Sequence, residues 1–175
     1  MTDQWPRYEV FKQEREGQPF RNVGSVHAPD AELALLGARD VFARRPSCHS
    51  LWVVPAAAVA TGTTDFPAAY HAPDGPMQPY AVCAKQSQRQ AMTYVDYLGQ
   101  VEAHSPAEAL QLAVTTFGGN ESTVWWAFPE AAVTASQADD ALDYAASTGK
   151  LFRLPNQYHT VVTMRQMRRG EAGEA

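Results

Sequence analysis

The sequence predicts an α+β protein with two similar ββαβ-type domains, each an antiparallel-rich sheet crossed by one amphipathic helix, packed together as an internal pseudo-dimer. Three observations predict this fold: a sequence repeat, strand-like alternation on both sides of a helical pattern in each copy, and a Pro- and Gly-rich connection between the copies. We expect a first repeat at residues 1–75, a second, diverged repeat at 76–164 and a flexible tail at 165–175.

The two copies stay in register within each expected element. Val23–Ala28 returns as Leu98–Ala103 at an offset of 75 residues, whereas the offset is 72 in the first strand and 74 in the third. The other matched positions include Tyr8 with Tyr80, Trp52 with Trp126, and Pro55 with Pro129. An offset that changes only between elements means that loops differ in length around a common framework. Since solenoids need at least three units, two copies predict a covalently joined pair of small domains.

Each repeat is expected to run strand, strand, helix, strand and a short helical turn. The strands of the first repeat are expected near residues 7–12, 20–27 and 51–54. In the second of these strands, Phe20, Asn22, Gly24 and Val26 alternate with the other residues and are expected to share one side that faces the core. The third strand is apolar on both faces, which predicts a place at the centre of a sheet.

The helix of the first repeat is expected from Asp30 to about Arg44. Its apolar residues fall at positions 31, 34, 35, 38, 41 and 42, a spacing that predicts a single buried stripe. The helix of the second repeat begins more clearly, with Ser105 as N-cap, Pro106 at the first helical position and Glu108 closing a capping box.

Four blocks of the first repeat, in the same order along the chain, resemble a known family. They are Trp5–Phe11, Val23–Ala28, Ala38–Arg45 and Ser50–Val54. Together they resemble the small B subunit (PaaB) of the phenylacetyl-CoA epoxidase, a bacterial multicomponent monooxygenase of aerobic phenylacetate breakdown. The family's tail pattern is divided between the copies, with Tyr70–Gly75 closing the first and Lys150–Tyr158 closing the second. Because the usual family member is a single-domain chain, this protein resembles a tandem-duplicated, fused form.

The resemblance implies a non-catalytic bridging subunit, with no metal, cofactor or catalytic residue of its own. In this family the small PaaB protein forms a dimer that bridges two heterodimers, each made of a catalytic di-iron subunit and a structural helical subunit. Those subunits are the implied partners, and the reductase of the complex stays open as a further one. Alone, the fused chain is expected to be a monomeric pseudo-dimer or a homodimer.

The candidate partner interface lies in the first repeat. The expected interface residues are Trp5, Tyr8, Glu9, His27, Arg39, Asp40, Arg44 and Arg45. The second repeat keeps core positions but replaces these polar residues, for example with Glu102 at the position of His27. Trp5 precedes the first strand and is the best candidate for an anchor, because aromatic residues and arginine dominate such contacts.

The chain lacks the motifs of the catalytic components. None of its 5 histidines follows a glutamate by three residues, the spacing that a di-iron centre takes from helices. It also lacks the phosphate-binding glycines and clustered cysteines of a reductase. A net charge of −5 without a basic stripe disfavours nucleic acid, and no apolar run is long enough for a membrane span. With 2 unclustered cysteines and no signal peptide, the protein is expected to be cytoplasmic.

Two catalytic interpretations remain as alternatives. His27 and Asp40 could form an acid–base pair, which would make the chain a free-standing small α+β isomerase or hydrolase. Cys48 and His49 could form a metal or nucleophile pair, although adjacent side chains on a strand point to opposite faces.

Overall fold

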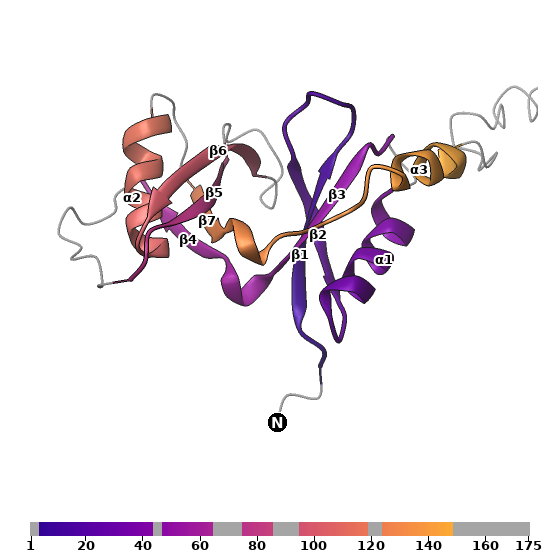
Figure 1. Cartoon of the computed structure of the whole chain (residues 1–175), viewed down its shortest axis with the longest axis horizontal. Helices are drawn as coiled ribbons and strands as arrows, with labels where there is room; N and C mark the ends of the chain where they lie inside the picture. Colours follow the sequence, from indigo (N-terminus) through magenta and orange to yellow (C-terminus); the bar gives the residue numbers. More distant parts are fainter. Residues whose placement is uncertain (1–3, 44–46, 65–74, 86–94, 119–123, 149–175) are drawn as a thin grey trace, which may run out of the picture.

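The computed structural model describes residues 4–43, 47–64, 75–85, 95–118 and 124–148, and shows an α+β fold built on one large antiparallel sheet (Figure 1). The first half contains β1 (Arg7–Gln13), β2 (Arg21–His27), α1 (Ala31–Phe42), β3 (Ser50–Pro55), η1 (Ala56–Ala58) and β4 (Ala60–Thr63). The second half contains β5 (Gln78–Ala84), β6 (Asp96–Ala103), α2 (Pro106–Phe117), β7 (Val124–Pro129), η2 (Glu130–Ala132), β8 (Thr134–Ala135) and α3 (Asp140–Thr148).

The order of the strands reads the same when the two halves are exchanged. The 8-stranded sheet runs β4-β7-β5-β6-β2-β1-β3-β8, and every neighbouring pair is antiparallel. The last strand of each half pairs with the other half: β4 pairs with β7, and β8 pairs with β3. The sequence predicts a helical turn after the third strand of each repeat but not these exchanged strands, because 4 and 2 residues are too short to show a period.

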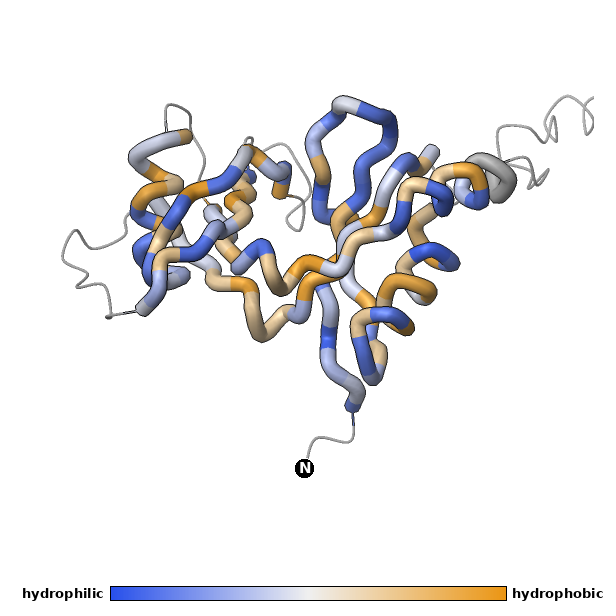
Figure 2. Tube along the Cα trace, viewed as in Figure 1, coloured by the Kyte–Doolittle hydropathy of each residue, from blue (hydrophilic) through white to orange (hydrophobic). Residues whose placement is uncertain are grey.

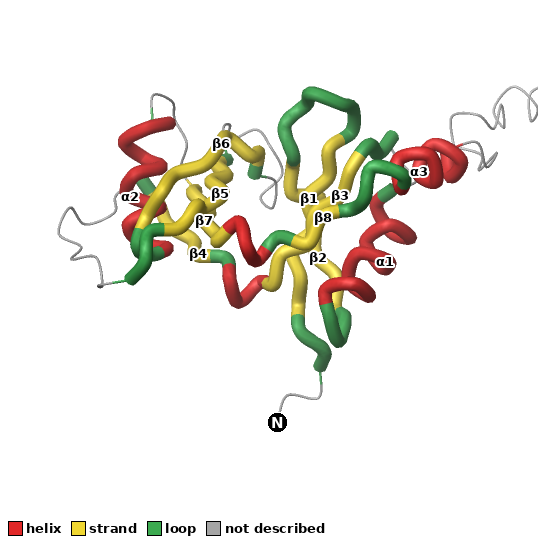
Figure 3. Tube along the Cα trace, in the orientation of Figure 1, coloured by secondary structure: helices red, strands yellow, loops and turns green. Residues whose placement is uncertain are grey.

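The helices cover the outer faces of the sheet, and the inner faces meet in the middle of the molecule (Figures 1 and 3). One core lies under α1 and includes Val10 and Val53, and a second core lies under α2 and includes Val82 and Ala127. A third core, which we call the central core, joins strands of both halves. Its buried members are Phe11, Val54, Ala81, Cys83, Val95 and Phe128. Figure 2 shows hydrophobic residues on the strands that cross this middle region.

A β-bulge at the same place in each half sets which residues face which core. Val10 pairs with Gly24 and Phe11 pairs with Asn22, so that Val23 is the extra residue of β2. The second half repeats this register shift between Val82 and Cys83. The bulge corrects the single core-facing side expected for β2: Phe20 packs against the central core, whereas Val26 packs against the core under α1.

The helix signals in the sequence are confirmed, except at the edge of the apolar stripe of α1. Ser105 Oγ accepts a hydrogen bond from Glu108 N at 3.2 Å, and Glu108 Oε2 accepts one from His104 N at 2.7 Å, which completes the predicted capping box. In α1, Ala34 and Ala38 are buried as expected. Val41 is 63% exposed, because it lies at the margin of the stripe and faces away from the sheet.

The two halves meet edge to edge at β2 and β6. Asn22 N donates to Val95 O at 2.9 Å, and Tyr97 N donates to Phe20 O at 2.7 Å. The offset of 75 residues exchanges these two hydrogen bonds, so the contact is reciprocal. Between them, Arg21 Nε lies 2.6 Å from Asp96 Oδ1, and these two residues are also 75 positions apart.

Candidate partner interface

His27 and Trp5 lie together at the start of the first half. The carbonyl oxygen of Trp5 accepts a hydrogen bond from Nδ1 of His27 at 2.9 Å, and Ala28 N donates to Pro6 O at 3.1 Å. These two bonds fasten the segment before β1 to the end of β2. The Trp5 side chain is 64% exposed, as an anchor for a partner requires. His27 therefore positions the backbone that carries the exposed indole.

The structure does not bring His27 and Asp40 together. His27 ends β2, just before α1, whereas Asp40 lies nine residues after Ala31, the first residue of the helix. At 1.5 Å per residue, that separation is about 14 Å along the helix axis. Both side chains are exposed, and Nδ1 of His27 is bonded to Trp5. The geometry gives no support to an acid–base pair of these two residues.

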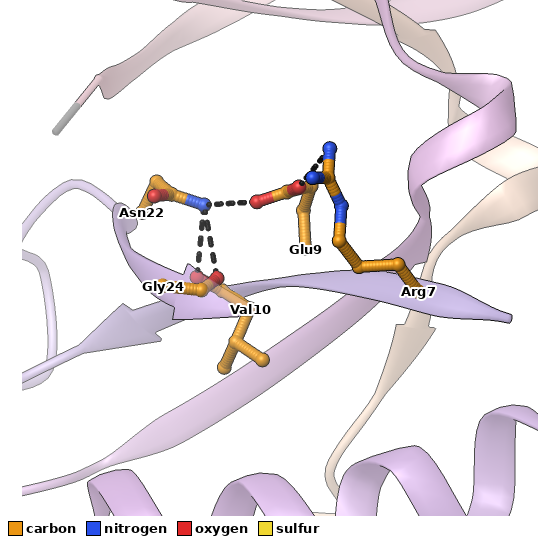
Figure 4. A network of polar contacts seen from close by, with 5 residues as sticks. All are labelled: Arg7, Glu9, Val10, Asn22 and Gly24. Carbon is orange, nitrogen blue, oxygen red and sulfur yellow. Dashed lines mark hydrogen bonds and ion pairs between the residues drawn. The ribbon is translucent and has the colours of Figure 1, made fainter. Parts of the chain in front are cut away.

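Two of the expected interface residues are buried, and a partner-facing role does not fit them. Tyr8 is 7% exposed and belongs to the core under α1. Glu9 is also 7% exposed, and its carboxylate lies 3.1 Å from Arg7 and accepts a hydrogen bond from Asn22 at 3.3 Å (Figure 4). The Asn22 amide also donates to the Val10 carbonyl oxygen. These contacts satisfy Glu9 within the chain itself. The alternating pattern of β1 could have predicted the burial of Tyr8.

The remaining expected residues lie on α1 or beyond it. Arg39 and Asp40 are exposed on the helix, and Arg39 lies in its last turn, where a cation meets the helix dipole favourably. Arg44 and Arg45 lie outside the described residues.

The outer face of α1 is apolar, a feature that the sequence reasoning missed. Three of its side chains are largely exposed: Leu33 (48%), Leu36 (51%) and Val41 (63%). At the equivalent positions, 75 residues later, α2 has Glu108, Gln111 and Thr116. A comparison of the two helices position by position would have shown this difference. Clustered apolar side chains on a solvent-facing surface are typical of a protein contact.

The described residues show no arrangement suited to metal binding or to cysteine chemistry. No group of three or more His, Cys, Asp or Glu side chains among them could hold a metal ion. Cys48 and Cys83 are free and buried. Burial raises the pKa of the Cys48 thiol to about 11, so it stays protonated near neutral pH and is a poor nucleophile. Burial also raises the pKa of the Cys83 thiol. No helix within the described ranges is both long and apolar enough to cross a membrane.

Comparisons with known proteins agree with the four blocks of the first repeat. Residues 4–75 match the PaaB family, described as phenylacetic acid degradation B. The chain is also 47% identical over 55 residues to the B subunit of the 1,2-phenylacetyl-CoA epoxidase of Escherichia coli (strain K12). That match covers 31% of this chain and 58% of the relative, so the chain spans less than two thirds of the relative's length. No solved structure matches the chain. In residues 4–75 the chain therefore carries a segment of the PaaB family.

Proposed function

We propose that this chain is a non-catalytic bridging subunit of a phenylacetyl-CoA epoxidase complex in aerobic phenylacetate degradation. Residues 1–75 and 76–164 are two repeats that form an internal pseudo-dimer, followed by a tail at 165–175. The PaaB match supports the type of complex, and it covers the first repeat. The repeat in the sequence and the matching element order of the two halves support the duplication.

The observation that carries the bridging role is the reciprocal contact between β2 and β6. In a twofold homodimer, residue i contacts residue j and residue j contacts residue i. The hydrogen bonds from Asn22 to Val95 and from Tyr97 to Phe20 follow that rule at an offset of 75 residues. A chain of this kind supplies both halves of a twofold bridge at once and presents α1 and α2 on opposite outer sides (Figure 1).

The surface proposed for partner binding combines the exposed indole of Trp5 with the outer face of α1. We define this α1 surface by Leu33, Leu36, Arg39, Asp40 and Val41, all of which are exposed. Apolar side chains flanked by charged ones suit the side of a helix in a helical partner subunit, because the apolar residues supply buried area and the charges set the register. The partners proposed are the catalytic di-iron subunit and the structural helical subunit of the epoxidase.

The test is the molar mass of the complex by light scattering. The chain is measured alone and then after co-expression with the two helical subunits of the epoxidase. A monomer that joins the complex as one chain per two helical heterodimers is the expected result. A chain that does not associate with these subunits contradicts the bridging function, and a complex with two chains per two heterodimers contradicts the internal pseudo-dimer.

A further inference from the structure

A pocket of about 230 Å³ lies where the two halves interlock. It is lined by Trp52, Ala81, Tyr97, Gln100, Glu130, Val133 and Ala135. Trp52 comes from β3 of the first half, and the other lining residues come from the second half, in or next to β5, β6, η2 and β8. The pairing of Trp52 with Ala135 in β8 brings these walls together. The pocket therefore exists only because the two halves exchange strands.

The walls of this pocket are aromatic and acidic. The Trp52 ring stacks on Phe20 with 3.6 Å between centroids and meets Tyr97 edge to face at 5.4 Å. Burial raises the pKa of the Tyr97 phenol, and the nearby charge of Glu130 contributes, so the phenol stays neutral. No lysine or arginine is among the residues that line the pocket. Aromatic faces beside a carboxylate favour a cation.

The equivalent place in the first half shows which cation fits. Glu9 is the counterpart of Ala81 at an offset of 72 residues, and it is paired with the guanidinium of Arg7 at 3.1 Å (Figure 4). In the second half, the counterpart of Arg7 is Pro79. The two replacements remove both the guanidinium and its carboxylate, which leaves space beside Ala81. Glu130, whose counterpart 74 residues earlier is Ala56, supplies a new carboxylate to this space.

We propose that this pocket binds the guanidinium group of an arginine side chain presented by a partner protein. A guanidinium is planar, stacks on an indole or phenol ring and donates paired hydrogen bonds to a carboxylate, whereas the lysine ammonium is a strongly hydrated point charge. The Glu130 carboxylate and the Gln100 side-chain carbonyl are the acceptors, and Trp52 and Tyr97 are the flat walls. The proposal goes beyond the bridging role and holds for any complex that the chain joins.

The first experiment titrates the full chain with Nα-acetyl-arginine amide and follows the indole N–H signal of Trp52 by NMR. We expect a saturable shift, and weaker binding of Nα-acetyl-lysine amide. Equal affinity for the two compounds, or no saturation up to about 100 mM, overturns the proposal. Free L-arginine binding more tightly than the capped compound would assign the pocket to a free ligand and overturn the partner assignment.

Two variants locate the binding. Glu130→Gln is expected to weaken binding about fivefold, the scale of a partly exposed ion pair, whereas Glu32→Gln on α1 leaves it unchanged. The double variant Pro79→Arg with Ala81→Glu rebuilds the Arg7–Glu9 pair in the second half and is expected to abolish binding by filling the pocket. Undiminished binding to Glu130→Gln, a surface substitution that leaves the core intact, places the cation elsewhere and overturns the proposal.

Discussion

Gly24 is the residue at which backbone and packing constraints coincide most closely. Its φ of +138° is a conformation that residues with a side chain rarely adopt, and an added Cβ would lie 3.0 Å from the ring of Phe42. We expect Gly24→Ala to lower the free energy of unfolding by about 1–3 kcal/mol, because the backbone strain and the ring contact act together. Urea denaturation followed by circular dichroism measures the change.

Gly37 provides the matched control for this substitution. It lies within α1, and an added Cβ would meet nothing within 4 Å. Gly37→Ala is therefore expected to raise the free energy of unfolding by about 0.5–1 kcal/mol, because alanine loses less backbone freedom than glycine in a helix. Equal effects of the two substitutions would show that the conformation at the bulge does not constrain residue 24.

At the scale of elements, the outer face of α1 is the feature most open to test. Replacing Leu33, Leu36 and Val41 with Glu, Gln and Thr gives α1 the residues that α2 has at these positions. Since all three side chains are exposed, stability should change by no more than about 0.5 kcal/mol per substitution. Affinity for the helical epoxidase subunits should fall about tenfold or more, as measured by calorimetric titration.

The control for this experiment lies on the other helix. Thr116 is exposed on α2 at the position that Val41 occupies on α1. Thr116→Ala should leave both stability and partner affinity unchanged. Loss of affinity from Thr116→Ala, or none from the triple substitution, would move the proposed contact away from α1.

Local signals allowed part of the elements to be predicted from the sequence. Ser105, Pro106 and Glu108 form a cap whose chemistry involves only neighbouring residues, and the structure confirms it. The exchanged strands β4 and β8 depend on distant partners, and nothing in their few residues indicates those partners. The burial of Glu9 also depends on distant residues, because it requires Asn22 on the neighbouring strand.

The junction between the halves connects the element scale to the whole molecule. Arg21 and Asp96 occupy equivalent positions, and their side chains form an ion pair of 2.6 Å with Asp96 largely buried. Arg21→Asp and Asp96→Arg should each destabilise the protein by about 1–3 kcal/mol, since each places like charges together. The double swap should recover part of that loss in urea denaturation. Strictly additive effects would show that the two residues do not interact.

At the scale of the whole molecule, the central core should make the two halves unfold together. Phe11 is fully buried, and its ring lies 5.3 Å from that of Phe128 in the other half. Phe11→Ala should lower the free energy of unfolding by about 3–5 kcal/mol. Amide hydrogen exchange should accelerate in β5 of the second half as much as in β1. Unchanged exchange in β5 would show that the halves are independent folding units.

The opposite charges at Arg21 and Asp96 could not arise in a pair of identical domains, where every substitution appears twice and each position on the twofold axis must tolerate its own copy. Joining the domains in one chain removes that restriction, so that each half can change alone. It also makes their association an intramolecular event, governed by a local effective concentration instead of the amount of protein in the cell. A bridge built in this way keeps both of its ends at any dilution.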